Sequence, residues 1–446
     1  MALITVNTLY SRISEPKAIR AARENFKYRM KGYERTTTYK SGQWDGYNHV
    51  ININGSFGTG LLPYVVNFLA EDGFVFDIVD ERKNELTTVD IDIEYLRDYQ
   101  QAMVEKVLSF SYCGMPFYRG IINGATNAGK TYISIALWQA FDEPNCIFLV
   151  HRVKLYKQQL EFFKEKLGAH KVGQVNDKIQ DSKKPFVVAM YRGALNVDLR
   201  RFDMVIVDEG HMAKGKLYKK VLNRIKADVR YYISGTPFKI DEKGRLGIIA
   251  SSGPELANIS NRQLIDLGYS AEPKIFMQKI VNDSDPYIRY PDAYEKYVVQ
   301  NEERNGKIQD FIITNRNARS CWVICRRVHH ATLLAGMLSA ELLTGETKTK
   351  EANAIIKDFI DQKIRVVVST MVIDVGMNLP IEAFVIALGG KSEVDILQLM
   401  GRALRMTEKY NDVLVLDFYD IGPYVEKHSI ERKRIYEEEQ FETLLI

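Results

Sequence analysis

One short stretch of this sequence restricts the fold more than any other. It consists of Gly124, Ala125, Thr126, Asn127, Ala128, Gly129, Lys130 and Thr131. An apolar run precedes it and a helical pattern follows it, which is the setting of a phosphate-binding loop. Glycines let backbone N–H groups approach phosphates closely, and the N-terminus of the helix adds a favourable dipole. The stretch therefore predicts an α/β domain that holds a nucleotide at the end of a strand.

A second cluster supplies the acids that such a nucleotide needs. Lys130 is expected to lie beside the outer phosphates, and the Thr131 hydroxyl to help hold magnesium. Asp208 and Glu209 follow the apolar run 204–207 directly, and α/β sheets place ligands at the carboxyl ends of strands. We expect Asp208 on the magnesium side and Glu209 to orient or activate the attacking water. ATP and Mg²⁺ are the predicted cofactors. His211, next to these acids, is a candidate for coupling the nucleotide to a second site.

A third cluster lies far along the chain, at residues 398–405. It contains Arg402 and Arg405, three positions apart. Two arginines suit the negative charge that develops on a transferring phosphoryl group. Their distance in sequence from the loop indicates that a second domain brings them to the nucleotide. Together the three clusters are typical of a nucleotide-driven motor.

Length and patterning indicate several domains. The chain has 446 residues, 46% of them hydrophobic and 26% charged, which is ordinary globular composition. Short apolar runs alternate with helical patterns in residues 91–255 and again in 315–446, which predicts two tandem parallel-sheet α/β domains. Residues 256–314 are expected to be a helical connection. Residues 1–90 are expected to form a small α/β domain, with a basic helix over 17–28.

Charge and cysteine content exclude some classes of protein. The formal net charge of +4 is too mild to prove a nucleic-acid partner, although residues 1–50 hold nine Lys/Arg against four Asp/Glu. Cys321 and Cys325 bracket an expected buried strand, where residues i and i+4 lie ~13 Å apart, so we expect no shared metal at this pair. No long apolar stretch or leader is visible. We expect a cytoplasmic monomer with no membrane partner.

At this point the residues resemble a family. Asp208-Glu209-Gly210-His211 together with Ser234-Gly235-Thr236-Pro237 resembles motifs II and III of the superfamily 2 helicases, in the DExH group. The resemblance implies two RecA-like domains and an ATPase that acts on a nucleic acid. It also implies that His211, Ser234 and Thr236 couple the nucleotide site to the polymer site.

Other stretches resemble further motifs of the same family. Residues 96–100 are similar to the adenine-recognising stretch, 150–155 to motif Ia, 369–380 to motif V and 398–405 to motif VI. The resemblance implies the following roles: Arg97 and Gln100 on adenine, Gly376 on the nucleotide, His151, Arg152 and Thr370 on nucleic acid, Gln398 in coupling, and Arg402 and Arg405 as arginine fingers. Asn378 stands where the family usually has an aspartate, which weakens the expected polar contact at that position.

The beginning of the chain resembles one branch of the family. Residues 39–46, followed by 60–64, are similar to the leading domain of phage recombination helicases of the UvsW type. That resemblance implies remodelling of forked and four-way DNA, and the host cytoplasm as location if a phage encodes the chain. Trp44 could stack on a base, although a lone tryptophan is more often part of a core.

The resulting hypothesis is an ATP-dependent DNA helicase or translocase that remodels branched DNA in replication, recombination or repair. Three alternatives stay open. The chain could move along double-stranded DNA without separating strands, it could act on RNA, or it could be an ATPase scaffold that binds nucleic acid without unwinding.

Overall fold

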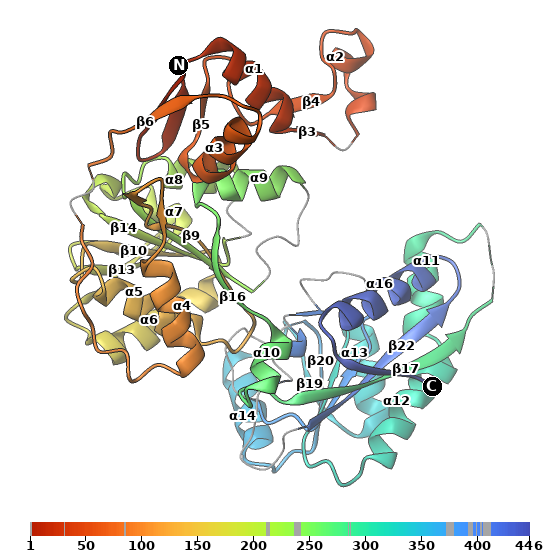
Figure 1. Cartoon of the computed structure of the whole chain (residues 1–446). Coiled ribbons are helices and arrows are strands. Elements are labelled where there is room, and N and C mark those ends of the chain that lie inside the picture. The colour runs from red at the N-terminus through yellow and green to blue at the C-terminus, as the bar shows by residue number, and fades with distance from the viewer. Residues whose placement is uncertain are drawn as a thin grey trace. The chain divides into compact units, whose positions relative to one another are not determined.

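The computed structural model describes the whole chain apart from short stretches. The residues outside the description are 1, 31, 84, 85, 211–214, 236–241, 284, 286, 372–378, 391–395, 398, 402, 403 and 405–411, together with the side chain of Glu242. The chain divides into two compact units, Met1–Ile259 and Ser260–Ile446 (Figure 1). Among the described helices, none is long and apolar enough to cross a membrane.

A small α/β module opens the first unit. Its four-stranded sheet has the order β5-β2-β1-β6. The strands are β1 (Ala2–Val6), β2 (Tyr10–Ile13), β5 (Ser56–Gly58) and β6 (Phe76–Asp80). Helices α1 (Pro16–Asn25) and α3 (Leu62–Glu71) contribute apolar side chains to its core. The separate domain expected over residues 1–90 stays a prediction, because these residues belong to the first compact unit, Met1–Ile259.

One helix of this module is shorter than predicted. The basic helix expected over 17–28 ends at Asn25, because Phe26 leaves helical geometry. Strand β3 (Lys27–Arg29) then pairs antiparallel with β4 (Tyr47–His49), and the short helix α2 (Thr37–Lys40) lies between them in the chain. This two-stranded ribbon and α2 project from the module (Figure 1).

The rest of the first unit is built on an eight-stranded sheet with the order β12-β11-β13-β10-β14-β15-β9-β16. The strands are β9 (Arg119–Gly124), β10 (Cys146–Val150), β11 (Val172–Val175), β12 (Gln180–Asp181), β13 (Phe186–Met190), β14 (Met204–Asp208), β15 (Val229–Ser234) and β16 (Glu255–Ile259). All neighbours are parallel except β11 and β12. Every residue of β10, β14 and β15 is buried, as expected for parallel strands covered on both faces.

Helices follow most of these strands. They are α4 (Asp98–Leu108), α5 (Lys130–Gln139), α6 (Val153–Leu167), α7 (Tyr191–Ala194), α8 (Lys216–Leu222) and α9 (Glu242–Ser251), with a small hairpin of β7 (Ser111–Tyr112) and β8 (Met115–Pro116) before β9. Because β9, β14 and β15 are parallel neighbours or near-neighbours, their carboxyl ends meet at one edge of the sheet. That carboxyl edge receives the phosphate-binding loop, Asp208 and Ser234.

The second unit holds a seven-stranded, fully parallel sheet with the order β19-β20-β18-β21-β22-β17-β23. The strands are β17 (Glu272–Val281), β18 (Cys321–Ile324), β19 (Glu341–Leu343), β20 (Val366–Ser369), β21 (Ala383–Ile386), β22 (Asp412–Ile421) and β23 (Glu442–Leu445). The described helices longer than a few residues are α10 (Asn261–Asp266), α11 (Tyr290–Tyr294), α12 (Glu302–Thr314), α13 (Val328–Leu338), α14 (Thr349–Ile360) and α16 (Val425–Glu438).

The connection expected over 256–314 is wrong for much of its length. Strand β16 belongs to the first sheet, and β17 pairs with β22 through ten residues. Sequence reasoning missed β17 because it is half-buried and alternating rather than continuously apolar, with Lys274, Gln278 and Lys279 among its residues. Helix α12 is also tied to the sheet, since its buried Arg304 forms an ion pair with Asp420 of β22.

Candidate active site

The loop after β9 has the geometry that its sequence predicts. Asn127 and Gly129 both have positive φ, 75° and 68°, so the chain turns sharply before α5 begins at Lys130. Two features exclude a side chain at Gly129. Its positive φ disfavours residues other than glycine, and a Cβ there would lie 2.1 Å from Gln100 Nε2. Lys130 folds back over the loop and its Nζ donates to the carbonyls of Gly124 (2.8 Å) and Ala125 (3.1 Å).

Gln100 at the start of α4 fastens this loop. Its Nε2 donates to the carbonyl of Ala128 (2.9 Å), and its Oε1 accepts from the Arg97 backbone N–H (3.0 Å). The Tyr99 hydroxyl donates to the same Ala128 carbonyl at 3.2 Å. The structure therefore brings the predicted adenine residues next to the phosphate-binding loop. Sequence reasoning missed Tyr99, whose role depends on this long-range contact.

Two carboxylates and a serine meet beside the loop. Asp208 ends β14 and is 8% exposed, and its Oδ1 accepts from the Glu209 N–H. Glu209 has a positive φ of 51°, and its Oε2 accepts from Ser234 Oγ at 3.1 Å. Ser234 ends the neighbouring strand β15, so one hydrogen bond joins the two motifs. A strained backbone at a paired acid is a common property of functional sites.

The electrostatics of Asp208 are unusual. Burial raises the pKa of Asp208 to about 7, and the nearby Glu209 carboxylate acts in the same direction, while Lys130 opposes both. A buried acid with a like-charged neighbour is unfavourable when ionised, and a divalent cation would relieve that repulsion. The position is therefore suited to a metal ion.

The glycine after Ser234 brings a further backbone against the loop. A Cβ at Gly235 would lie 3.1 Å from the Gly124 carbonyl oxygen and 3.7 Å from both Lys130 Nζ and Thr126 N. This close approach leaves a glycine-lined cradle around the lysine amine. Together with Asp208, the cradle fits a magnesium-bound nucleotide in charge and in donor type.

The predicted metal ligand Thr131 and the motif Ia residues lie on the same edge of the sheet. Thr131 Oγ1 donates to Gln159 Oε1 of α6 at 3.4 Å, a partner that sequence reasoning missed. His151 and Arg152 follow β10, and Arg152 is the exposed residue that precedes α6. The structure thus groups these residues with the phosphate-binding loop without assigning them a ligand.

The remaining predicted residues lie elsewhere or outside the described residues. Thr370 follows β20 in the second unit and is 7% exposed, with its N–H donated to the Leu343 carbonyl. Trp44 lies in the N-terminal module, half-buried, and donates to the Tyr47 carbonyl at 2.6 Å. The residues outside the description are His211, Thr236, Gly376, Gln398, Arg402 and Arg405.

Two parts of the chain match the models of known protein families. Residues 94–239 match the family "Type III restriction enzyme, res subunit", and residues 303–407 match the "Helicase conserved C-terminal domain". The crystal structure of the Pyrococcus furiosus Hef helicase domain covers 78% of this chain and 100% of its own length, with a TM-score of 0.55 and 13% identity. That likeness concerns the fold, and it identifies the two sheets as RecA-like.

Two viral proteins are similar in sequence. The protein named helicase 22 of Sulfolobus islandicus filamentous virus is 24% identical to this chain. The aligned region covers 72% of this chain and 64% of the viral protein. The ATP-dependent DNA helicase UvsW of phage T4 is 22% identical over 96% of this chain and 95% of its own length. Given both matched families and the order of the motifs, the chain belongs to the superfamily 2 ATP-dependent helicases and resembles phage T4 UvsW.

Proposed function

We propose that this helicase acts on DNA and remodels branched structures, meaning forks and four-way junctions, in replication, recombination or repair. The observation that carries the proposal is the extent of the likeness to UvsW. It covers 96% of the chain, whereas the two family matches begin only at residue 94. The likeness therefore includes the N-terminal module, which carries no ATPase motif.

The chemistry proposed for the carboxyl edge is phosphoryl transfer from ATP to water. Mg²⁺ would supply charge neutralisation on the phosphate oxygens, and Thr131 and Asp208 would hold it. Lys130 binds the outer phosphates once its amine leaves the Gly124 carbonyl. Glu209, oriented by Ser234, orients the water and accepts its proton. Arg402 and Arg405 stabilise developing charge from the second RecA-like domain.

The surface of the N-terminal module supports a nucleic-acid role. On the β3–β4 ribbon the Arg29 guanidinium lies 4.6 Å from the Tyr47 ring centroid and 4.8 Å from that of Tyr33. Beside it is an open cavity of about 650 Å³, lined in part by Trp44, Arg23, Asn48 and Asn52. Half-buried rings next to cations are suited to stacking on bases while the cations hold a phosphate backbone.

Four substrates of matched sequence test the proposal: a forked DNA, a four-way DNA junction, a linear DNA duplex and an RNA duplex. We expect ATP-dependent strand separation or branch migration on the first two, slower reaction on the linear duplex and none on RNA. Equal unwinding of RNA would favour the RNA helicase. Duplex-stimulated ATP hydrolysis with displacement of a bound roadblock but no strand separation would favour the translocase. Hydrolysis without either movement would favour the scaffold.

The part played by the module is best tested in the full chain. Its core residues form one apolar cluster with residues of the eight-stranded-sheet domain, so deleting residues 1–90 would expose that cluster. We expect Arg29→Ala combined with Trp44→Ala to lower the preference for fork over linear duplex, with DNA-independent ATP hydrolysis unchanged. The control is Lys17→Ala, which removes an exposed positive charge on α1. An unchanged fork preference would make the module a structural cap.

A further inference from the structure

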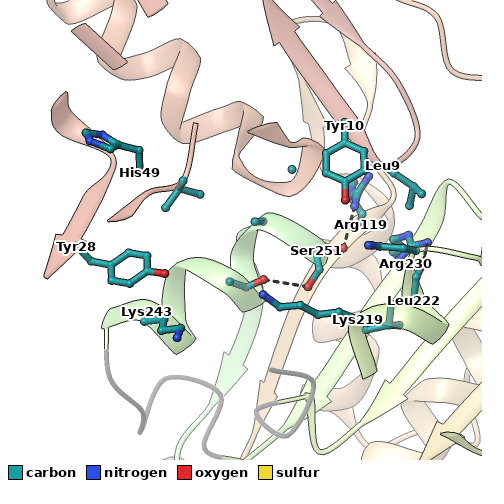
Figure 2. A pocket seen from close by; sticks show the side chains of 15 residues that line it. Leu9, Tyr10, Tyr28, His49, Arg119, Lys219, Leu222, Arg230, Lys243 and Ser251 are labelled. Atoms are coloured by element: carbon teal, nitrogen blue, oxygen red, sulfur yellow. Dashed lines mark hydrogen bonds between the residues drawn. The ribbon is translucent and has the colours of Figure 1, made fainter. Parts of the chain in front are cut away.

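A basic cavity lies within the first unit, between the N-terminal module and the domain built on the eight-stranded sheet. Its volume is about 280 Å³. Figure 2 shows Tyr28 and His49 on the module side, and Lys219 and Arg230 on the side of the sheet domain. Four of the lining residues are basic: Arg119, Arg230, Lys219 and Lys243. Among the described lining residues there is no aspartate or glutamate.

Two of these cations form an unusual buried pair. Arg119 and Arg230 are register partners on the adjacent parallel strands β9 and β15, and each is 1% exposed. Like charges side by side on neighbouring strands destabilise a sheet, and buried charges are normally paired with opposite ones. Neither arginine has an ion pair with any described carboxylate. Asp228 and Tyr232 nevertheless favour the charged form of both arginines electrostatically.

Backbone carbonyls hold the two guanidinium groups in place. Arg119 donates to the carbonyls of Thr8 (2.6 Å), Ser251 (2.9 Å) and Ser252 (2.9 Å). Arg230 donates to those of Ala227 and Leu222 at 3.2 and 3.1 Å, and to that of Ile225. These bonds satisfy N–H groups and fix geometry, but a carbonyl carries no net charge. Among the described carboxylates, only Asp228 offsets part of the positive charge of the pair.

The pKa of Arg119 reflects its buried, positively charged surroundings. Burial, followed by the neighbouring charges of Arg230 and Arg82, lowers the pKa of Arg119 to about 9, so the group is still positive at neutral pH. The approach to the cavity is also basic. Helix α8 carries exposed Lys216, Lys219 and Lys220 and contains no acid. Such a concentration of one sign of charge attracts a multivalent anion.

We infer that this cavity is a phosphate-binding site, separate from the ATP site. Its size and its cations fit one phosphate group, with Tyr10 and Tyr28 at the wall for an attached ring. The site lies at the amino end of β9, whereas the phosphate-binding loop follows its carboxyl end, roughly 17 Å away along the strand. The phosphate comes either from a nucleic-acid strand or from a free anion, and the basic helix leading to the cavity favours the strand.

Matched variants of the full-length protein test this site. Lys219→Ala with Lys243→Ala removes the two exposed cations of the cavity. Lys106→Ala with Lys226→Ala removes two exposed cations that lie neither in the cavity lining nor on α8. The first arm measures binding of a short labelled oligo-dT strand at several chloride concentrations without nucleotide. The second arm measures the Tm in inorganic phosphate and in chloride at equal ionic strength.

We expect the cavity variant to bind the strand about tenfold more weakly at low salt, and its log–log salt slope to fall by about 1.4, or about 0.7 for each lysine. The control variant should change by less than half as much. Loss of the phosphate-specific Tm gain in the cavity variant alone, with strand binding intact, would assign the site to a free anion. The ATP site contributes equally to the Tm of all three proteins. Indistinguishable behaviour of the cavity and control variants in both arms overturns the inference.

Discussion

The two edges of the eight-stranded sheet handle charge in opposite ways. At the carboxyl edge, the Lys130 amine rests on loop carbonyls within reach of buried Asp208 and of Glu209, so charges of both signs meet in a glycine-lined space. At the amino edge, Arg119 and Arg230 lie side by side, held by backbone carbonyls and with no ion pair to a described carboxylate. The first edge is arranged for a reaction in which charge moves, and the second for holding an anion still.

The difference also affects what each edge tolerates. Residues of the carboxyl edge sit at strand ends, where side chains can be replaced without disturbing the sheet. The amino edge is packed against the N-terminal module, with backbone against backbone. Substitutions at the carboxyl edge should therefore act mainly on turnover, and substitutions at the amino edge should act mainly on stability or anion binding.

The largest effect is expected for Lys130→Ala. No neighbouring described cation can replace the amine over the loop, so ATP hydrolysis should fall by at least about 10³-fold, with little change in Tm. Steady-state phosphate release and thermal unfolding measure the two quantities. Lys106→Ala, an exposed lysine of α4, serves as control. A stability loss that accounts for the lost activity would break the proposed division of roles.

Arg402→Ala and Arg405→Ala should come next. Each is expected to lower turnover about 10³-fold while changing ATP affinity much less, because a transition-state contact affects the reaction more than ground-state binding. Single-turnover hydrolysis and binding of a fluorescent ATP analogue separate the two. Weaker ATP binding with unchanged turnover would mean that the carboxyl edge needs no cation from the second RecA-like domain.

A smaller effect, on stability, is expected for Gly60→Ala. A Cβ at Gly60 would lie 2.0 Å from the Ile249 carbonyl oxygen of α9 and 2.7 Å from the Gly253 N. We expect the free energy of unfolding to fall by at least about 2 kcal/mol, since backbone cannot move aside cheaply. Gly306→Ala in α12 has open space around it and should stabilise by about 0.5–1 kcal/mol. Urea unfolding compares the two. Normal turnover of folded Gly60→Ala would sharpen the contrast between the edges.

The last expected effect is on stability at the carboxyl edge, and it depends on pH. The folded-state pKa of Asp208, about 7, lies above its ordinary value of 3.8. Its ionisation therefore destabilises the free protein fully above pH 7, and this penalty disappears as the pH falls toward 4. Without magnesium or nucleotide, Asp208→Asn should be more stable than wild type by about 1–3 kcal/mol at pH 8, with the gain shrinking by pH 5. Asp77→Asn, exposed on β6, is the control. A gain that does not depend on pH would contradict the raised pKa.

Sequence reasoning predicted the carboxyl edge because its motifs are local. The spacing within residues 124–131, and the position of Asp208 directly after an apolar run, can both be read along the chain. The parallel-sheet architecture of both domains followed from the alternation of short apolar runs with helical patterns, and their RecA-like character followed from the family resemblance. Gln159 and Tyr99 could not be found this way, because their contacts with Thr131 and Ala128 depend on helices packed from elsewhere.

The amino edge could not be predicted for a related reason. Arg119 and Arg230 are far apart in sequence and follow no motif, and only the pairing of β9 with β15 makes them neighbours. Sequence reasoning did not predict strand β17, because its polar residues interrupt the apolar run that is expected of a parallel strand. In both places the decisive information is strand order and register, which one sequence does not display.

Strand β9 has a mechanical consequence. At its amino end, Arg119 grips the Thr8 carbonyl of the N-terminal module, and at its carboxyl end Gly124 opens the phosphate-binding loop. The six-residue strand β9 between these two points is hydrogen-bonded to a neighbouring strand on both sides. We therefore expect the N-terminal module and the phosphate-binding loop to move together as one rigid body. A hinge that converts ATP turnover into movement is then expected outside β9.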